Sequence, residues 1–195
     1  TGRLRERTAQ RDIGGMAFRS WPVFCLALIA LACVVGRADV RAKPAQPSPA
    51  QFTPAEVMVD PELARSDYVE HCAGCHGVQG KSAPAPLPEL FGRVGWFMCT
   101  PQSRAYLLRL PNIAHSRIKD NAELADMMNY VVFVIGAGSV PPGTRPFTGA
   151  EVTRERPLVM DSASLTAERA RHAADAIRKC RAPASLGLLY PGETK

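Results

Sequence analysis

Two cysteines and a histidine stand close together in the stretch Cys72-Ala73-Gly74-Cys75-His76. The thiols are three positions apart, and the imidazole follows the second thiol directly. Covalent haem attachment uses this spacing, because each sulfur adds across one vinyl group of the porphyrin and the adjacent imidazole reaches the iron. The motif therefore predicts one covalently bound haem c, attached through Cys72 and Cys75 and ligated by His76.

Three other sites contain a Cys-x-x-Cys pair, and the sequence argues against each. A zinc site needs a second pair of ligands at short spacing, whereas Cys99 and Cys180 stand alone. A thioredoxin-like redox pair lies between a strand and a helix, but this pair follows a predicted helix and precedes a loop. A disulfide between Cys72 and Cys75 leaves His76 without a role.

The elements around the motif are predicted to be helical. Asp60-Pro61-Glu62 indicates the start of a helix that runs to about residue 71, because Asp caps a helix N-terminus and Pro suits its first position. A loop rich in Gly and Pro follows at 74–95. A loop of this length inside a compact domain needs something to organise it, and a cofactor would do so.

Further helices are predicted at 103–110, from Asp120-x-x-Glu123 to Gly136, from the capping box Thr148-x-x-Glu151, and at 166–180, with a loop at 112–119. The helix that ends at Gly136 carries a single apolar stripe of helical spacing, made of Leu124, Met127, Met128, Val131, Val132 and Ile135. No strand pair is evident. The fold class is therefore mainly α, with long loops.

The N-terminal segment predicts export. A basic flank precedes an apolar run at 23–36, which is too short for a comfortable bilayer span, and small residues follow it. We assign 1–42 to an N-terminal extension and signal peptide, and 43–54 to a Pro-rich linker. An uncleaved membrane anchor and a lipoprotein acylated at Cys33 are the alternatives. All three place the following domain outside the cytoplasm.

The net charge of +6 does not indicate nucleic-acid binding. Residues 1–38 hold six arginines and two acids, and the rest of the chain holds 18 basic and 16 acidic residues. A body with balanced charge and no basic run lacks the surface that neutralises a phosphate backbone. We therefore expect no nucleic-acid partner.

Over about 60–136, the sequence resembles the class I cytochromes c. The resemblance rests on 67–77 with its Cys-x-x-Cys-His motif, on Gly80-Lys81, on 88–92, on the short helix ending at Leu110, and on Asn129-Tyr130. It implies that the first and last core helices cross and that the loops wrap the haem. It also implies that the Pro88 carbonyl accepts from Nδ1 of His76, and that Arg93 and Trp96 meet haem propionates.

The chain departs from the family at the sixth ligand. Class I cytochromes usually place a methionine before the last helix, whereas the loop 111–119 contains His115 and no methionine. His115 would give a bis-histidine iron with a lower reduction potential than a His/Met iron. Met98 is the other candidate, and a site without a protein ligand is the third. Met127 and Met128 belong to the apolar stripe and are expected in the core.

Two expectations concern the C-terminal part. Cys99 and Cys180 are candidates for a disulfide, which an oxidising compartment permits. The charged stretch 168–181 is expected to be a solvated helix face, with His172 in solvent. We place a cytochrome c haem domain at 55–140 and a C-terminal extension at 141–195.

Together these features predict a periplasmic c-type cytochrome that carries single electrons and is not an enzyme. The resemblance implies periplasmic redox proteins as donor and acceptor, for example a dehydrogenase and an oxidase. One alternative is a ligand-binding protein or enzyme with an open sixth site. Another is a subunit of a larger oxidoreductase complex that docks through its C-terminal extension. The sequence does not indicate the oligomeric state.

Overall fold

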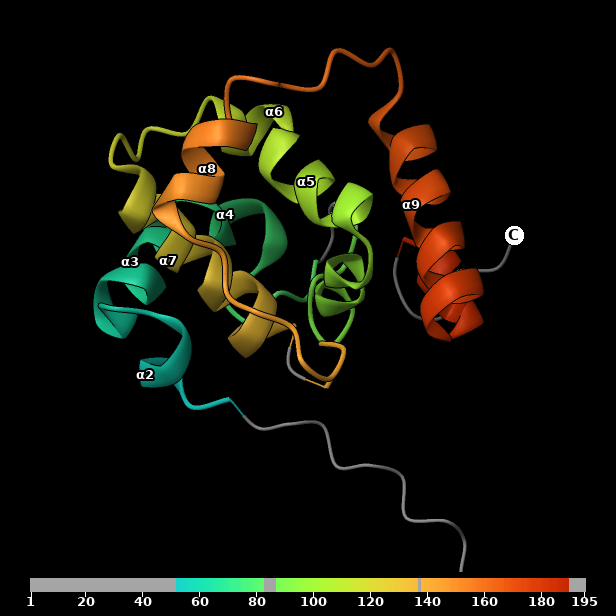
Figure 1. The fold of residues 1–195 in the computed structure, drawn as a ribbon, viewed down its shortest axis with the longest axis horizontal. Coiled ribbons are helices and arrows are strands. Elements are labelled where there is room, and N and C mark those ends of the chain that lie inside the picture. The colour runs from blue at the N-terminus through green and yellow to red at the C-terminus, as the bar shows by residue number, and fades with distance from the viewer. Residues whose placement is uncertain (1–51, 83–86, 137, 190–195) are drawn as a thin grey trace, which may run out of the picture. The chain divides into compact units, whose positions relative to one another are not determined.

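The regular structure of this chain is helical, which confirms the mainly α fold (Figure 1). The computed structural model describes residues 52–82, 87–136 and 138–189, and no strand is present in them. The predicted signal peptide and most of the predicted linker lie outside these residues. Within the same residues, no helix is both long enough and apolar enough to cross a membrane.

Eight α-helices, two 3-10 helices and one π-helix follow one another in the described residues. In chain order they are α2 (Pro54–Val57), α3 (Pro61–His71), α4 (Ala73–His76), the 3-10 helix η1 (Val94–Cys99), α5 (Pro101–Arg109), α6 (Pro111–Ala114), α7 (Asn121–Asn129), the π-helix η2 (Tyr130–Ile135), α8 (Gly149–Glu155), α9 (Leu165–Cys180) and the 3-10 helix η3 (Ala184–Gly187).

The predicted helix starts are confirmed by their caps. The side chain of Asp60 accepts from the Leu63 amide, that of Asp120 from two amides of α7, and that of Thr148 from the Glu151 amide. The loop expected at 112–119 is shorter, because its first residues form α6. Pro111 cannot continue α5 because its nitrogen carries no N–H to donate. The same residue suits the first position of a new helical turn, α6.

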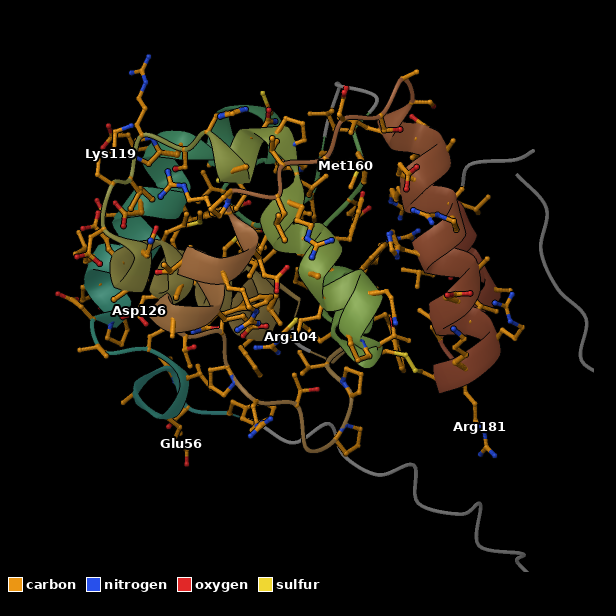
Figure 2. The ribbon with its side chains drawn as sticks, turned by 45° about the horizontal axis from the view of Figure 1, so that its top comes forward. Glu56, Arg104, Lys119, Asp126, Met160 and Arg181 are labelled. Carbon is orange, nitrogen blue, oxygen red and sulfur yellow. A yellow bond between two sulfur atoms is a disulfide. The ribbon has the colours of Figure 1, made fainter. Side chains whose placement is uncertain are left out.

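The core forms where α3 packs on α7 and η2. Every residue of the predicted apolar stripe is buried, which confirms its assignment to the core, including Met127 and Met128. Asp126 of α7 fastens the start of α3, because its Oδ2 accepts from the amides of Val59 and Asp60 at 2.8 and 3.1 Å (Figure 2). The two helices are thus held by apolar packing and by a local polar anchor.

The chain beyond residue 140 packs closely on the helices before it, and α8 lies against α7 (Figure 1). The buried amide of Asn129 exchanges two hydrogen bonds with the backbone of Phe147. Arg104 of α5 forms a bidentate ion pair with Glu151, with Nε–Oε1 2.6 Å and Nη2–Oε2 2.7 Å (Figure 2). Bidentate pairs of this kind are geometrically specific, so they fix where α8 sits on α5.

A disulfide joins Cys99 of η1 to Cys180 at the end of α9, with 6.2 Å between the Cα atoms. The prediction that 168–181 is a solvated face is wrong in part. Arg169 and His172 are both more than nine-tenths buried, because α9 packs on η1 and α5. The His172 ring lies 4.5 Å from the Tyr106 ring, and the Arg169 guanidinium lies over Phe97.

Replacing both disulfide cysteines, Cys99→Ser with Cys180→Ser, is expected to lower the free energy of unfolding by about 2 to 5 kcal/mol. The bond closes a sequence separation of 81 residues, and its loss restores that freedom to the unfolded chain. Denaturant titration followed by far-UV circular dichroism measures the change. Coincident midpoints for the variant and the oxidised parent would contradict the expectation.

Burial of His172 predicts a pH-dependent loss of stability. Burial holds the pKa of its imidazole below the ordinary value of 6.5, so the unfolded chain binds a proton at this site more readily than the folded chain. The free energy of unfolding should therefore fall as the pH drops through about 6.5. His172→Phe keeps a ring against Tyr106 and should lose less stability between pH 7 and 5. Denaturant unfolding at pH 7 and pH 5 measures the difference, and an equal loss in His172→Phe and in the parent would contradict the expectation.

Candidate functional site

The Cys72-x-x-Cys75-His76 motif occupies a single helical turn directly after α3. The amide of Cys72 still donates to the Tyr68 carbonyl of α3, and the amides of Cys75 and His76 both donate to the Cys72 carbonyl. Residues three and four apart on a helical turn are neighbours on one side. The fold therefore presents two thiols and one imidazole together, which the spacing alone predicted.

Both motif thiols are free. Cys75 is exposed, Cys72 is half-buried, and neither forms a disulfide, so the disulfide alternative does not hold in this structure. Burial raises the pKa of the Cys72 thiol to about 11, which keeps that sulfur protonated at neutral pH. Among the described residues, no three His, Cys, Asp or Glu side chains are arranged to hold a metal ion.

The imidazole of His76 is held in the form that binds a metal. Burial lowers the pKa of His76 below 6.5, and the nearby backbone of Pro88 has a smaller, opposing effect on that pKa. The ring is therefore neutral at pH 7, as a metal ligand must be. Its Nδ1 is fully buried and has no hydrogen-bond partner among the described residues. The Pro88 carbonyl accepts from Ser82 Oγ at 3.3 Å.

The backbone after the motif is held in place by hydrogen bonds. The hydroxyl of Tyr68 donates to the Gly77 carbonyl at 2.6 Å, and the Gly80 carbonyl accepts from the amides of Leu90 and Phe91. Gly80 has a φ of 73°, and a Cβ at this position would lie 2.2 Å from Ile135 Cγ2. Only glycine fits there, so the chain can pass tightly between the motif and η2.

These residues fit a covalent haem. Two free thiols and a neutral imidazole share one turn, and the buried Nδ1 of His76 needs the acceptor that Pro88 can supply. Sequence reasoning missed the Tyr68 hydroxyl, which donates to the residue directly after this turn, and the Ser82 hydroxyl, which donates to the Pro88 carbonyl. The position of Tyr68 four residues before Cys72 on a helix is a signal for the first, because i and i+4 share a helix face.

Arg93 lies at the C-terminal extension. It is 8% exposed, and its Nη2 donates to the carbonyls of Ser185 and Leu188 at 2.7 and 2.6 Å. The sequence indicated nothing about these partners, which lie more than 90 residues away along the chain. Trp96 of η1 is half-buried against the core. The propionate contacts expected of Arg93 and Trp96 stay predictions.

The candidate sixth ligands lie in different surroundings. His115 is exposed and lines a surface hollow of about 550 Å³ that Glu70 and His71 also line. Met98 is buried, and its Sδ lies 3.9 Å from Nη1 of Arg104. His115, Met98 and a site without a protein ligand therefore stay the three predictions for the sixth position.

Two curated proteins are similar to this chain, and both are named cytochrome c-552. One, from a defined strain of Thermus thermophilus, is 26% identical over 128 residues, which cover 55% of this chain and 86% of that protein. The other, also from Thermus thermophilus, is 26% identical over 116 residues, which cover 50% of this chain and 88% of that protein. No family model and no solved structure matches. The similarity supports a c-type cytochrome, in agreement with the motif.

Tyr68→Phe should lower the free energy of unfolding by about 1 to 2 kcal/mol. The substitution keeps the buried ring but leaves the Gly77 carbonyl without its hydroxyl partner. Tyr130→Phe is the matched control, because the Tyr130 ring packs 5.5 Å from Tyr68 while its hydroxyl makes no hydrogen bond in the described part of the chain. Equal losses for the two variants in denaturant unfolding would refute a specific role for the Tyr68 hydroxyl.

Proposed function

We propose that this protein is an exported carrier of single electrons that holds one haem c. The observation that carries the proposal is the single helical turn on which two free thiols stand beside a half-buried, neutral imidazole. A haem bound there would supply the redox chemistry, an iron that alternates between the ferric and ferrous states. The similarity to proteins named cytochrome c-552 supports the same function.

Each residue of the site has a defined role in this proposal. Cys72 and Cys75 attach the porphyrin, and His76 provides the proximal ligand. The Pro88 carbonyl orients the His76 ring by accepting a hydrogen bond from its Nδ1–H. Such a hydrogen bond keeps a ligating imidazole in one tautomer. The buried side chains of α3, η1 and η2 exclude water, and no residue is assigned as a catalytic acid, base or nucleophile.

The proposed place of action is the periplasm. Supporting features are the predicted signal peptide and the disulfide between Cys99 and Cys180, since disulfides persist in oxidising compartments. Its proposed partners are periplasmic redox proteins, one as electron donor and another as acceptor. A dehydrogenase and an oxidase are examples of the two classes.

A second candidate function is ligand binding at an open sixth site. The observation in its favour is the surroundings of the two candidate sixth ligands, Met98 and His115. Met98 has Arg104 Nη1 near its sulfur, and His115 is exposed at the C-terminal cap of α6. If neither side chain reaches the iron, a small molecule can bind there, and a role beyond electron transfer follows.

Absorption spectra of the protein matured in a haem-attaching periplasm test both functions. The ferric, ferrous and carbon monoxide-treated ferrous forms are compared. A low-spin spectrum that carbon monoxide leaves unchanged is expected for a carrier with two protein ligands. Immediate binding of carbon monoxide would instead support the open-site function.

Variants of the motif test the attachment itself. Cys75→Ser should leave haem bound through one thioether, which shifts the reduced α-band and leaves the haem more easily lost on denaturation. The double variant Cys99→Ser with Cys180→Ser changes two cysteines outside the motif and should keep both thioethers. A parent protein that carries no covalent haem, shown by its intact mass, would overturn the proposed function.

A further inference from the structure

The Pro88 carbonyl and the Glu89 amide belong to one planar peptide group. In a trans peptide the carbonyl and the amide point to opposite sides. The Glu89 amide donates to the carbonyl of Leu189, at 2.8 Å, in the C-terminal extension. The Pro88 carbonyl therefore faces the other way, where it accepts from Ser82 Oγ, and Nδ1 of His76 is buried without a hydrogen-bond partner among the described residues. The position of Leu189 thus helps to set the direction of the Pro88 carbonyl, the expected acceptor for Nδ1 of His76.

Arg93 holds the chain that contains Leu189. Its Nη2 donates to the carbonyls of Leu188 and Ser185, and the side chain is buried. Hydrogen bonds from a charged donor are stronger than neutral ones, and burial removes the competition from water. Because Arg93 lies only four residues after Glu89, the short stretch 89–93 contacts residues 185–189 through both a backbone amide and a side chain.

The segment 184–189, which we call the C-terminal clamp, is also fastened to α9. Arg169 of α9 donates to the carbonyl of Leu186, whose side chain is 1% exposed. The disulfide at Cys180 anchors the end of α9 to η1 shortly before the clamp begins. The clamp therefore connects α9 on one side with the stretch 88–93 on the other.

We propose that Arg93 and the C-terminal clamp position the Pro88–Glu89 peptide group so that its carbonyl orients His76. Arg93 is then a positioning residue that acts through the clamp, because its guanidinium donates to the carbonyls of Ser185 and Leu188. The proposal rests on the proposed function, in which His76 ligates the haem iron. It gives the extension after residue 140 a role in setting the redox properties of the haem.

Arg93→Gln should raise the reduction potential of the haem. Without the charged donor the clamp loosens, the peptide group is free to rotate, and Nδ1 of His76 loses its acceptor. A ligating imidazole that donates to a carbonyl is more basic and favours ferric iron, so losing this bond favours ferrous iron. Spectroscopic redox titration measures the shift, and Arg93→Lys, which retains one charged nitrogen, should fall between the parent and the Gln variant.

Arg169→Gln is the matched control. It removes a hydrogen bond from an arginine to the same clamp but leaves the contacts of Arg93 and Glu89 intact. A higher potential for Arg93→Gln together with a clearly smaller shift for Arg169→Gln supports the proposal, because Arg169 fastens the clamp to α9 and does not join it to the stretch 88–93. Equal shifts, or no shift for Arg93→Gln, overturn it, because the effect would then be general loosening or absent.

Amide hydrogen exchange at Glu89 provides a readout that does not depend on haem. Its amide donates to Leu189, so exchange should be faster in Arg93→Gln than in the parent, and the increase should be clearly smaller in Arg169→Gln. If Arg93→Gln does not fold, Arg93→Lys carries the same comparison, and exchange equal to the parent overturns the proposal. If the parent attaches no haem, the proposed function fails, while exchange in the full haem-free chain still decides whether Arg93 holds the clamp.

Discussion

The side chain of Tyr68 connects α3, the helix formed by α7 and η2, and the chain directly after the Cys-x-x-Cys-His motif. It is completely buried between α3 and the helix formed by α7 and η2, where its ring packs against Tyr130. Its hydroxyl donates to the Gly77 carbonyl, the first residue after the Cys-x-x-Cys-His motif. Burial also raises the pKa of Tyr68 to about 12, so the hydroxyl stays a donor at any physiological pH. The packing of α3 on α7 and η2 and the direction of the chain after Gly77 are therefore set together.

In its described residues, 77–82 and 87–93, the loop between the motif and η1 has no helix or strand, and its amides donate to acceptors elsewhere in the chain. The carbonyls of Gly80, Ile135 and Leu189 receive amides from the stretch 89–92, so a turn, the π-helix and the C-terminal extension each hold part of it. A loop held this way keeps its backbone polar groups satisfied without forming a sheet. These hydrogen bonds fix the backbone that follows His76, while the Cys75 thiol stays exposed.

Polar contacts hold residues 141–189 against the helices that precede them. Arg104 with Glu151, Asn129 with Phe147 and Arg93 with Ser185 and Leu188 are all specific in direction, and the disulfide between Cys99 and Cys180 adds a covalent tie. A buried charged group does not readily change its hydrogen-bond partner, because leaving a buried charge unpaired costs free energy. These contacts therefore hold residues 141–189 in one place against the preceding helices.

The sequence by itself determined the local features. The motif at 72–76 indicated haem attachment, the capping residues located the starts of the helices, and the apolar stripe of α7 and η2 identified the core, because each depends on near neighbours along the chain. It did not predict α6, the burial of His172, or the partners of Arg93. These depend on which surfaces meet across long sequence separations, and a charged helix face such as that of α9 looks solvated until another element packs on it. Tertiary structure alone decided those pairings, since hydrogen bonding and burial are properties of the assembled surfaces.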